Sequence, residues 1–253
     1  MEIRQIGVVG AGTMGHGIAQ IAAQAGYYVL LYDSSEEALA KAAKKISASL
    51  EKFVGKGQII PSERDEVVAR ISLTSDLSEF DDADLIIEAV TENQEVKGDV
   101  FRQLDEIAKR ECILASNTSS IPISRLAQGV SDSRRKKIIG MHFMNPPYAV
   151  PLMEMIRGRD TSQETVAITR QVAERLGRDP IIESQDRAGF VVNRILLRAI
   201  NEAAKVVEEG TASAEDVNHA VIIGVWSSKG MPILELADLI GIDICCNVLR
   251  IIA

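Results

Sequence analysis

The stretch that decides the fold of this chain is Gly10–Gly15, GAGTMG, which follows an apolar run and opens a helical pattern. Gly10 permits a tight turn, Gly12 lets the backbone approach a pyrophosphate, and Gly15 lets a helix and a strand pack closely. Phosphates are favoured at such a helix N-terminus, where free N–H groups and the helix dipole attract negative charge. The stretch therefore predicts dinucleotide binding rather than a glycine-rich turn that only packs a helix.

A carboxylate at the end of the next apolar run indicates which dinucleotide is bound. Val29–Tyr32 favours a second strand, and Asp33 closes it. The Asp33 carboxylate can accept hydrogen bonds from a ribose 2′-hydroxyl and would repel a 2′-phosphate, which predicts NAD rather than NADP. Thr13 and Met14 are expected to join the three glycines in the cofactor site, whereas His16 is interpreted as a packing or solvent residue.

Strand-like runs alternate with helical patterns through the first part of the chain, which predicts a parallel sheet covered on both faces. Helices over 36–53 and from Pro61 onward are expected to form a hairpin inserted into the sheet topology. The expected fold is α/β, a Rossmann-type doubly wound, mostly parallel sheet followed by an all-helical C-terminal domain. The strands are predicted over 6–9, 29–32, 85–89, 113–115 and 138–143, with helices over 12–25, 95–109 and 162–176.

From about residue 186 the patterns become helical throughout, with a long helix over 190–209 that Gly210 ends. Further helices are expected over 213–223 and 234–240 and from 243 onward. We therefore predict an NAD-binding domain over 1–185 and a helical dimerisation and substrate domain over 186–253.

Composition narrows the class of protein. The chain has 253 residues, 46% of them hydrophobic, and a net charge of −8, which argues against general nucleic-acid binding. Its apolar runs are shorter than the ~18 residues that a membrane-spanning helix needs. Cys112, Cys245 and Cys246 form neither a disulfide framework nor a metal-ligand pattern, so we expect no metal and a cytoplasmic location.

Two polar clusters follow predicted strands, where open α/β sheets bind ligands. In the first, EAVTEN at 88–93 and the following Lys97, we expect Glu92 and Lys97 to hold the carboxamide and ribose end of the cofactor. In the second, SNTSS at 116–120, Ser119 offers a hydroxyl to a substrate oxygen or to the cofactor. A polar turn that caps the next helix is the alternative interpretation of this second cluster.

A histidine and a carboxylate downstream indicate proton transfer. His142 opens HFMNPP at 142–147, and Glu154 follows it. A polarised histidine beside a dinucleotide predicts a dehydrogenase, in which hydride goes to the cofactor and a proton goes to the base. The alternative from these residues alone is a buried histidine at the end of a strand.

Four motifs together carry a resemblance to a known family: GAGTMG at 10–15, SNTSSI at 116–121, GMHFMNPP at 140–147 and GFVVNR at 189–194. Their order and spacing are similar to those of the L-3-hydroxyacyl-CoA dehydrogenases, particularly the short bacterial or archaeal 3-hydroxybutyryl-CoA type. The resemblance implies that His142 is the general base and that Glu154 orients it. It also implies that Ser119 and Asn193 hydrogen-bond the reacting oxygen and that Asn145 lies close to NAD.

The resemblance further implies an acyl-CoA substrate. Lys45, Ser49, Lys52 and Lys56 follow i, i+4, i+7 and i+11, so they share one helical face that could meet the phosphates of coenzyme A. The family points most directly at Ser49 and Lys56, with Lys52 close by. The alternative is a solvated helix face.

The chain departs from the family pattern near its end. The family normally has a Pro-Met-Gly-Pro run where this chain has WSSKGMPI at 226–233, so we expect a different turn. Family members normally continue past the position of Ala253, so the helical domain is expected to be truncated. Dimerisation, which in the family uses that domain, would be the property most affected.

Two other functions remain open on the sequence. One is a dehydrogenase of free hydroxy acids or sugar acids on the same fold, similar to the gulonate dehydrogenases. The other is a non-catalytic NAD-binding protein, against which the combination of His142, Glu154, Ser119 and Asn193 argues.

Overall fold

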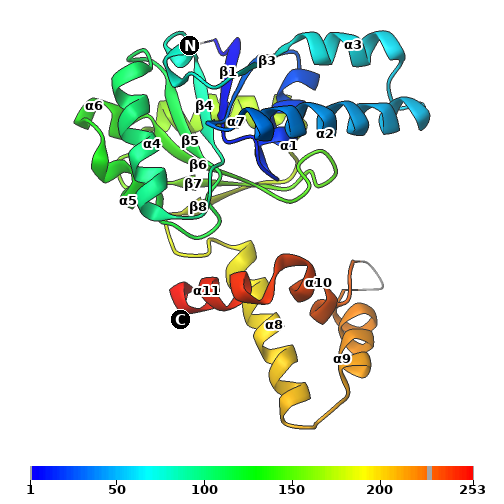
Figure 1. Ribbon diagram of the computed structural model, residues 1–253. Helices are drawn as coiled ribbons and strands as arrows, with labels where there is room; N and C mark the ends of the chain where they lie inside the picture. The colour runs from blue at the N-terminus through cyan, green and yellow to red at the C-terminus, as the bar shows by residue number, and fades with distance from the viewer. Residues whose placement is uncertain (1, 227–229, 253) are drawn as a thin grey trace. The chain divides into compact units, whose positions relative to one another are not determined.

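The computed structural model describes residues 2–226 and 230–252. The chain divides into two compact units, Met1–Asp186 and Arg187–Ala253, which are described separately here. Figure 1 shows the first unit as a sheet with helices on both faces and the second as helices alone. Within the described residues, no helix is long and apolar enough to cross a membrane.

The first unit is built on a sheet that has eight strands in the described residues, in the order β3-β2-β1-β4-β5-β6-β7-β8. Neighbouring strands run parallel, except that β7 runs antiparallel to β6. The predicted Rossmann-type, mostly parallel sheet is therefore confirmed. The strands are β1 (Gln5–Val9), β2 (Tyr28–Tyr32), β3 (Ile71–Thr74), β4 (Leu85–Glu88), β5 (Ile113–Ser116), β6 (Ile138–Phe143), β7 (Met153–Arg157) and β8 (Ile181–Gln185).

The helices of this unit connect the strands and cover the sheet. They are α1 (Gly15–Gln24), α2 (Glu36–Gly55), α3 (Pro61–Ala69), α4 (Gln94–Ile107), α5 (Ile123–Leu126), α6 (Asp132–Arg135) and α7 (Gln163–Arg175). The predicted hairpin is α2 and α3, which lie between β2 and β3 in the chain (Figure 1). Ser35 begins α2 because its hydroxyl accepts a hydrogen bond from the Ala38 amide, and Pro61 begins α3.

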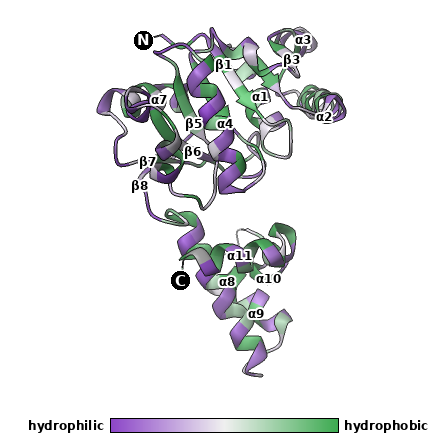
Figure 2. Ribbon diagram, turned by 60° about the vertical axis from the view of Figure 1, so that its left-hand side comes forward, coloured by the Kyte–Doolittle hydropathy of each residue, from purple (hydrophilic) through white to green (hydrophobic). Residues whose placement is uncertain are grey.

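Successive side chains of a strand alternate between two faces of the sheet, one packed in the main hydrophobic core and the other carrying His142. Ile139, Met141 and Phe143 of β6 belong to the core cluster that includes the buried faces of α1, α2 and α7. Because successive side chains in a strand point to opposite faces, His142 lies on the other face of the sheet. The same alternation places Glu88, Ser116 and Glu154 on the His142 face. Figure 2 shows the sheet as largely hydrophobic, which matches burial on both faces.

The second unit consists of helices around a small apolar core. The helices are α8 (Val192–Glu208), α9 (Ala214–Ala220), α10 (Ile233–Ile240) and α11 (Ile242–Ile252), with a π-helical turn over Val221–Val225. Leu197, Ile200, Val217 and Ile233 are among the residues buried in this core. The predicted all-helical C-terminal part is confirmed. Of the segment 226–233, where the turn was predicted to differ from the family pattern, residues 227–229 lie outside the described residues, so that prediction stays a prediction.

Candidate active site

The central feature of the site is a histidine that faces a carboxylate across two antiparallel strands. His142 of β6 is the register partner of Glu154 of β7, and its Nδ1 lies 2.8 Å from Glu154 Oε2. Both side chains are buried. Because an ionised carboxylate can only accept, Nδ1 carries the proton and Nε2 is left as the basic nitrogen. Glu154 therefore fixes the tautomer that a general base at Nε2 requires.

Ser119 reaches the other nitrogen of the same ring. Its Oγ lies 3.1 Å from His142 Nε2, and in the neutral tautomer the hydroxyl donates to that nitrogen. The side chain of Asn117 accepts a hydrogen bond of 2.9 Å from the Phe143 amide, which ties the 116–120 loop to β6. The structure thus brings Ser119, His142 and Glu154 into one hydrogen-bonded chain at the carboxyl end of β5 and β6.

The glycine turn has the shape that a pyrophosphate requires. Gly10 has φ of +104°, and a Cβ there would lie 2.7 Å from the Ala89 carbonyl oxygen, so a side chain is excluded. A Cβ at Gly15 would overlap the Gly10 carbonyl oxygen. A side chain at Gly12 would face open space, and Met14, the N-cap of α1, makes no side-chain cap hydrogen bond. The turn, the open space and the uncapped helix start therefore fit a dinucleotide phosphate.

Asp33 lies against this turn. Its Oδ2 accepts a hydrogen bond of 2.9 Å from the Ala11 amide, and its Oδ1 accepts one of 3.0 Å from Ser35. The carboxylate is half-buried at the end of β2, the position from which a ribose hydroxyl is bound in this fold. The prediction that Asp33 contacts NAD stays a prediction.

A buried ion pair lies beside the 116–120 loop. Lys97 Nζ is 2.7 Å from Glu88 Oε1 and 3.4 Å from Glu92 Oε2, and it also donates to the Val90 carbonyl. Lys97 is only 1% exposed. Burial raises the pKa of the Glu88 carboxyl, while Lys97, the Ser116 hydroxyl and the Val90 amide oppose that rise. The predicted cofactor contact of Lys97 remains a prediction, and its observed contacts lie within the protein.

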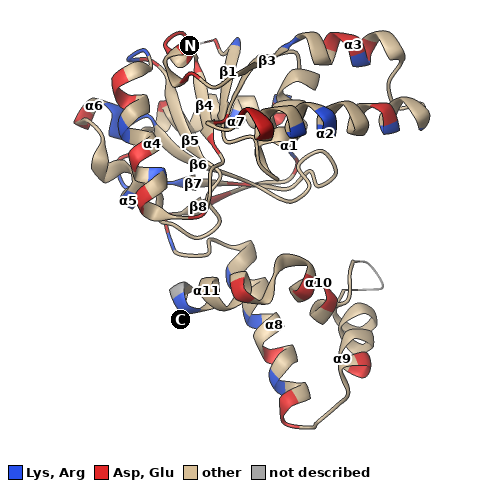
Figure 3. Ribbon diagram, in the orientation of Figure 1, with Lys and Arg blue, Asp and Glu red and all other residues tan. Residues whose placement is uncertain are grey.

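The lysine face of α2 lines a cavity of about 460 Å³. Blue segments along α2 in Figure 3 mark its basic residues. The cavity brings together residues that were predicted for the cofactor with residues that were predicted for coenzyme A: Thr13, Asn145, Lys45, Ser49, Lys52 and Lys56. Lys56 caps the C-terminal end of α2. Residues predicted to bind the cofactor and residues predicted to bind coenzyme A therefore line the same cavity, and all of them belong to the first unit.

Sequence reasoning did not assign five residues of this cavity to a binding site: His16, Ala48, Phe53, Pro146 and Tyr148. His16, interpreted as a packing or solvent residue, lines the cavity, and its Nδ1 donates to the Gly12 carbonyl oxygen at 2.7 Å. Phe53 and Tyr148 form its aromatic wall, with ring centroids 6.2 Å apart. Tyr148 directly follows the HFMNPP motif, and this position was the one sequence signal that could have assigned it to the site.

Asn193 lies in the first turn of α8 in the helical unit, and its predicted role stays a prediction.

Comparison with protein families agrees with these motifs. Residues 5–187 match the model of the 3-hydroxyacyl-CoA dehydrogenase NAD-binding domain, and residues 189–253 match that of the 3-hydroxyacyl-CoA dehydrogenase C-terminal domain. The chain belongs to the 3-hydroxyacyl-CoA dehydrogenase family. The predicted family, enzyme class and NAD cofactor are thereby confirmed. Among the described residues of this dehydrogenase, no cluster of His, Cys, Asp and Glu could hold a metal ion.

Relatives of the dehydrogenase match it over nearly its whole length. A protein of Deinococcus radiodurans named probable 3-hydroxybutyryl-CoA dehydrogenase is 45% identical, over 98% of this chain and 87% of the relative. The crystal structure of (S)-3-hydroxybutyryl-CoA dehydrogenase PaaH1 from Ralstonia eutropha is 38% identical, with a TM-score of 0.93, and the match covers 99% of this chain and 87% of that one. That of M. tuberculosis FadB2 is 36% identical, with a TM-score of 0.94, over 100% and 87% of the two chains.

Proposed function

We propose that the dehydrogenase interconverts (S)-3-hydroxyacyl-CoA and 3-oxoacyl-CoA with NAD(H), and that its substrates are the short-chain pair 3-hydroxybutyryl-CoA and acetoacetyl-CoA. The observation that carries the proposal is the hydrogen-bonded chain of Ser119, His142 and Glu154 at the carboxyl edge of the sheet. Open α/β sheets bind ligands at that edge, and the glycine turn ends there as well. The names of the relatives support the short acyl chain.

In the proposed mechanism, His142 Nε2 takes the proton of the substrate 3-hydroxyl group. NAD, when bound, supplies the hydride acceptor. Glu154 stabilises the imidazolium that forms, because its carboxylate is held 2.8 Å from Nδ1 in a buried position. Ser119 Oγ, which lies 3.1 Å from the same Nε2, would hydrogen-bond the reacting oxygen. In the reverse direction the imidazolium returns the proton to that oxygen.

The activity is tested by following NADH absorbance with acetoacetyl-CoA and, separately, with free acetoacetate. We expect NADH oxidation with the thioester and little with the free acid, because the lysine-lined cavity would supply binding energy only to coenzyme A. Equal rates with both substrates would favour a dehydrogenase of free hydroxy acids instead. Binding of NADH without turnover of either substrate would favour a non-catalytic NAD-binding protein.

Asp33→Asn is expected to weaken the preference for NADH over NADPH. The substitution keeps the side-chain volume but removes the charge that would repel a 2′-phosphate. We expect the ratio of kcat/KM for the two cofactors to fall about tenfold, which corresponds to the loss of ~1.4 kcal/mol of discrimination. The measurement is kcat/KM with each cofactor, and an unchanged ratio would mean that Asp33 does not contact the ribose.

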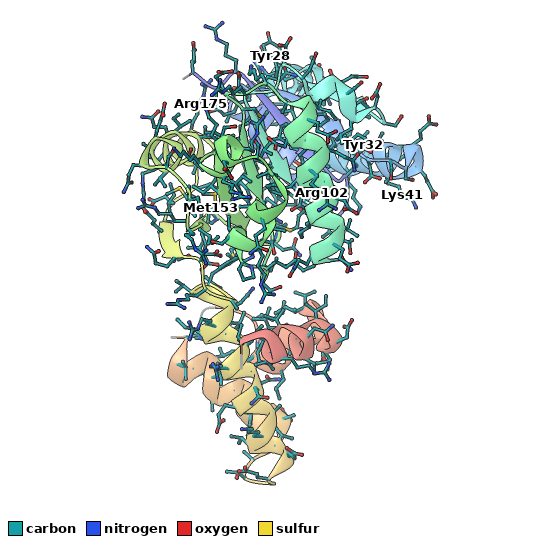
Figure 4. The ribbon with its side chains drawn as sticks, turned by 90° about the vertical axis from the view of Figure 1, so that its left-hand side faces the viewer. Tyr28, Tyr32, Lys41, Arg102, Met153 and Arg175 are labelled. Atoms are coloured by element: carbon teal, nitrogen blue, oxygen red, sulfur yellow. The ribbon has the colours of Figure 1, made fainter. Side chains whose placement is uncertain are left out.

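Lys52→Ala and Lys56→Ala are each expected to raise KM for acetoacetyl-CoA. A charged hydrogen bond to a phosphate at an exposed position gives an increase of about three- to tenfold, with kcat nearly unchanged. The matched control is Lys41→Ala, because Lys41 pairs with Glu37 on the outer surface of α2 (Figure 4) and does not line the cavity. An equal effect of the control substitution would indicate that the lysines act through net charge alone.

We further infer a homodimer formed through the helical unit, and a cytoplasmic location. Supporting the first, large apolar side chains are exposed on that unit, including Ile195, Val225 and Leu239, each 69% exposed. Supporting the second, Cys112 and Cys245 are buried free thiols, which are typical of a reducing compartment. Sedimentation of the purified protein tests the dimer.

A further inference from the structure

One carboxylate oxygen of Glu92 accepts four hydrogen bonds from the 116–120 loop, which carries Ser119. Glu92 Oε1 accepts from Thr118 Oγ1 at 2.6 Å, from the Ser119 amide at 2.9 Å, and from the amide and hydroxyl of Ser120 at 3.0 and 2.9 Å. A single acceptor thus contacts three consecutive residues. The backbone around Ser119 is arranged about this oxygen.

The carboxylate of Glu92 is itself fixed in place. Lys97 lies 3.4 Å from Glu92 Oε2, and the Lys97 ammonium is held by Glu88 at 2.7 Å in a position that is 1% exposed. Burial alone would raise the pKa of Glu92, but Lys97 and the donors of the loop hold it below its usual value. The loop therefore meets an ionised acceptor on a rigid support.

The rest of the loop is anchored to the same support. Ser116 Oγ donates to Glu88 Oε2 at 2.6 Å, and it accepts from the Thr118 amide at 3.1 Å. The ion pair of Glu88 and Lys97 thus connects to the loop through Ser116 at its start and through Glu92 at its centre. Ser119 Oγ, at the end of this network, lies 3.1 Å from His142 Nε2.

We propose that Glu92 is a positioning residue: by holding the backbone of the loop, it sets the place of the Ser119 hydroxyl relative to His142 Nε2. The inference rests on the proposed function, since it requires Ser119 and His142 to act on the reacting oxygen. This role is separate from the predicted contact of Glu92 with the cofactor. Oε1 accepts the hydrogen bonds of the loop, whereas the side chain as a whole is 39% exposed and can also be reached by a ligand. A displaced hydroxyl would stabilise the transition state less, so the effect falls on kcat.

The test is a double-mutant cycle in kcat, measured at saturating NADH and acetoacetyl-CoA with Glu92→Ala, Ser119→Ala and the double variant. We expect Glu92→Ala to lower kcat about tenfold or more, as misplacement of a catalytic group does. In the Ser119→Ala background we expect the same change to lower kcat less than about twofold, because residues that act as a unit are not additive. Losses that multiply in the double variant would overturn the proposal.

The controls separate this role from folding, from cofactor binding and from the activity itself. Glu95→Gln changes an exposed carboxylate in the first turn of α4, the helix that begins two residues after Glu92, and is expected to leave kcat unchanged. If Glu92→Ala does not fold, the cycle is run with Glu92→Gln and is interpreted in the same way. A cofactor contact of Glu92 would appear in KM for NADH and would persist in the Ser119→Ala background. An inactive native protein would refute the proposed function, whereas an active one with multiplying losses refutes only the positioning role.

Discussion

Replacing His142 with glutamine is expected to lower kcat for acetoacetyl-CoA reduction by about 10²–10⁴-fold, the range in which a general acid–base contributes to catalysis. Glutamine can still hydrogen-bond Glu154, but it cannot take or return a proton at the position of Nε2. Binding of NADH is expected to be unchanged, because the residues that fit the dinucleotide are those of the glycine turn and Asp33. Steady-state kinetics and NADH titration by fluorescence measure the two effects separately.

The matched control for this substitution is His219→Gln, which makes the same change at an exposed histidine of the helical unit. It is expected to leave both kcat and NADH binding unchanged. If His142→Gln abolished NADH binding along with turnover, the histidine would have a structural role. A retained rate would remove His142 from the mechanism altogether.

Replacing Lys97 with methionine is expected to destabilise the first unit by about 3–5 kcal/mol, because removing one member of a buried ion pair leaves the other charge uncompensated. Glu88 is fully buried and would keep only the Ser116 hydroxyl and the Val90 amide as partners. Urea unfolding followed by circular dichroism measures the loss. Tryptophan fluorescence would not report on this unit, since the single tryptophan, Trp226, lies in the helical unit.

The same variant should lose further stability as the pH rises. Burial raises the pKa of Glu88 in the folded protein, and without Lys97 that pKa rises further. Above the unfolded pKa, near 4.5, the folded state then binds more protons than the unfolded state, so the free energy of unfolding falls with increasing pH. Adding Glu88→Gln to Lys97→Met removes the stranded charge and should restore part of the stability. A double variant as unstable as the single one would contradict this account.

Local patterns were sufficient for much of the fold. GAGTMG at 10–15 and the strands around it were predictable because a glycine turn between a buried strand and a helix is a local requirement. The α2–α3 hairpin was predictable from helix periodicity and Pro61. The strands β3, β7 and β8 were missed. Polar or charged residues alternate with apolar ones in ISLT at 71–74 and MEMIR at 153–157, and IIESQ at 181–185 has only two apolar residues. Pairing with a neighbouring strand therefore stabilises these strands more than their own composition does.

The candidate site also has features that the sequence predicts and features that only the tertiary structure shows. The sequence by itself determined which residue types are present: the glycine turn with Asp33, a histidine after a strand, a nearby carboxylate, and a lysine face on one helix. Only the tertiary structure decided that Glu154 lies directly opposite His142, because β7 returns antiparallel to β6 in one particular register. It also decided that Glu92 holds the Ser119 loop, since these residues meet only when β4 and β5 pair. Such contacts depend on strand pairing between distant segments, and local sequence does not encode that pairing.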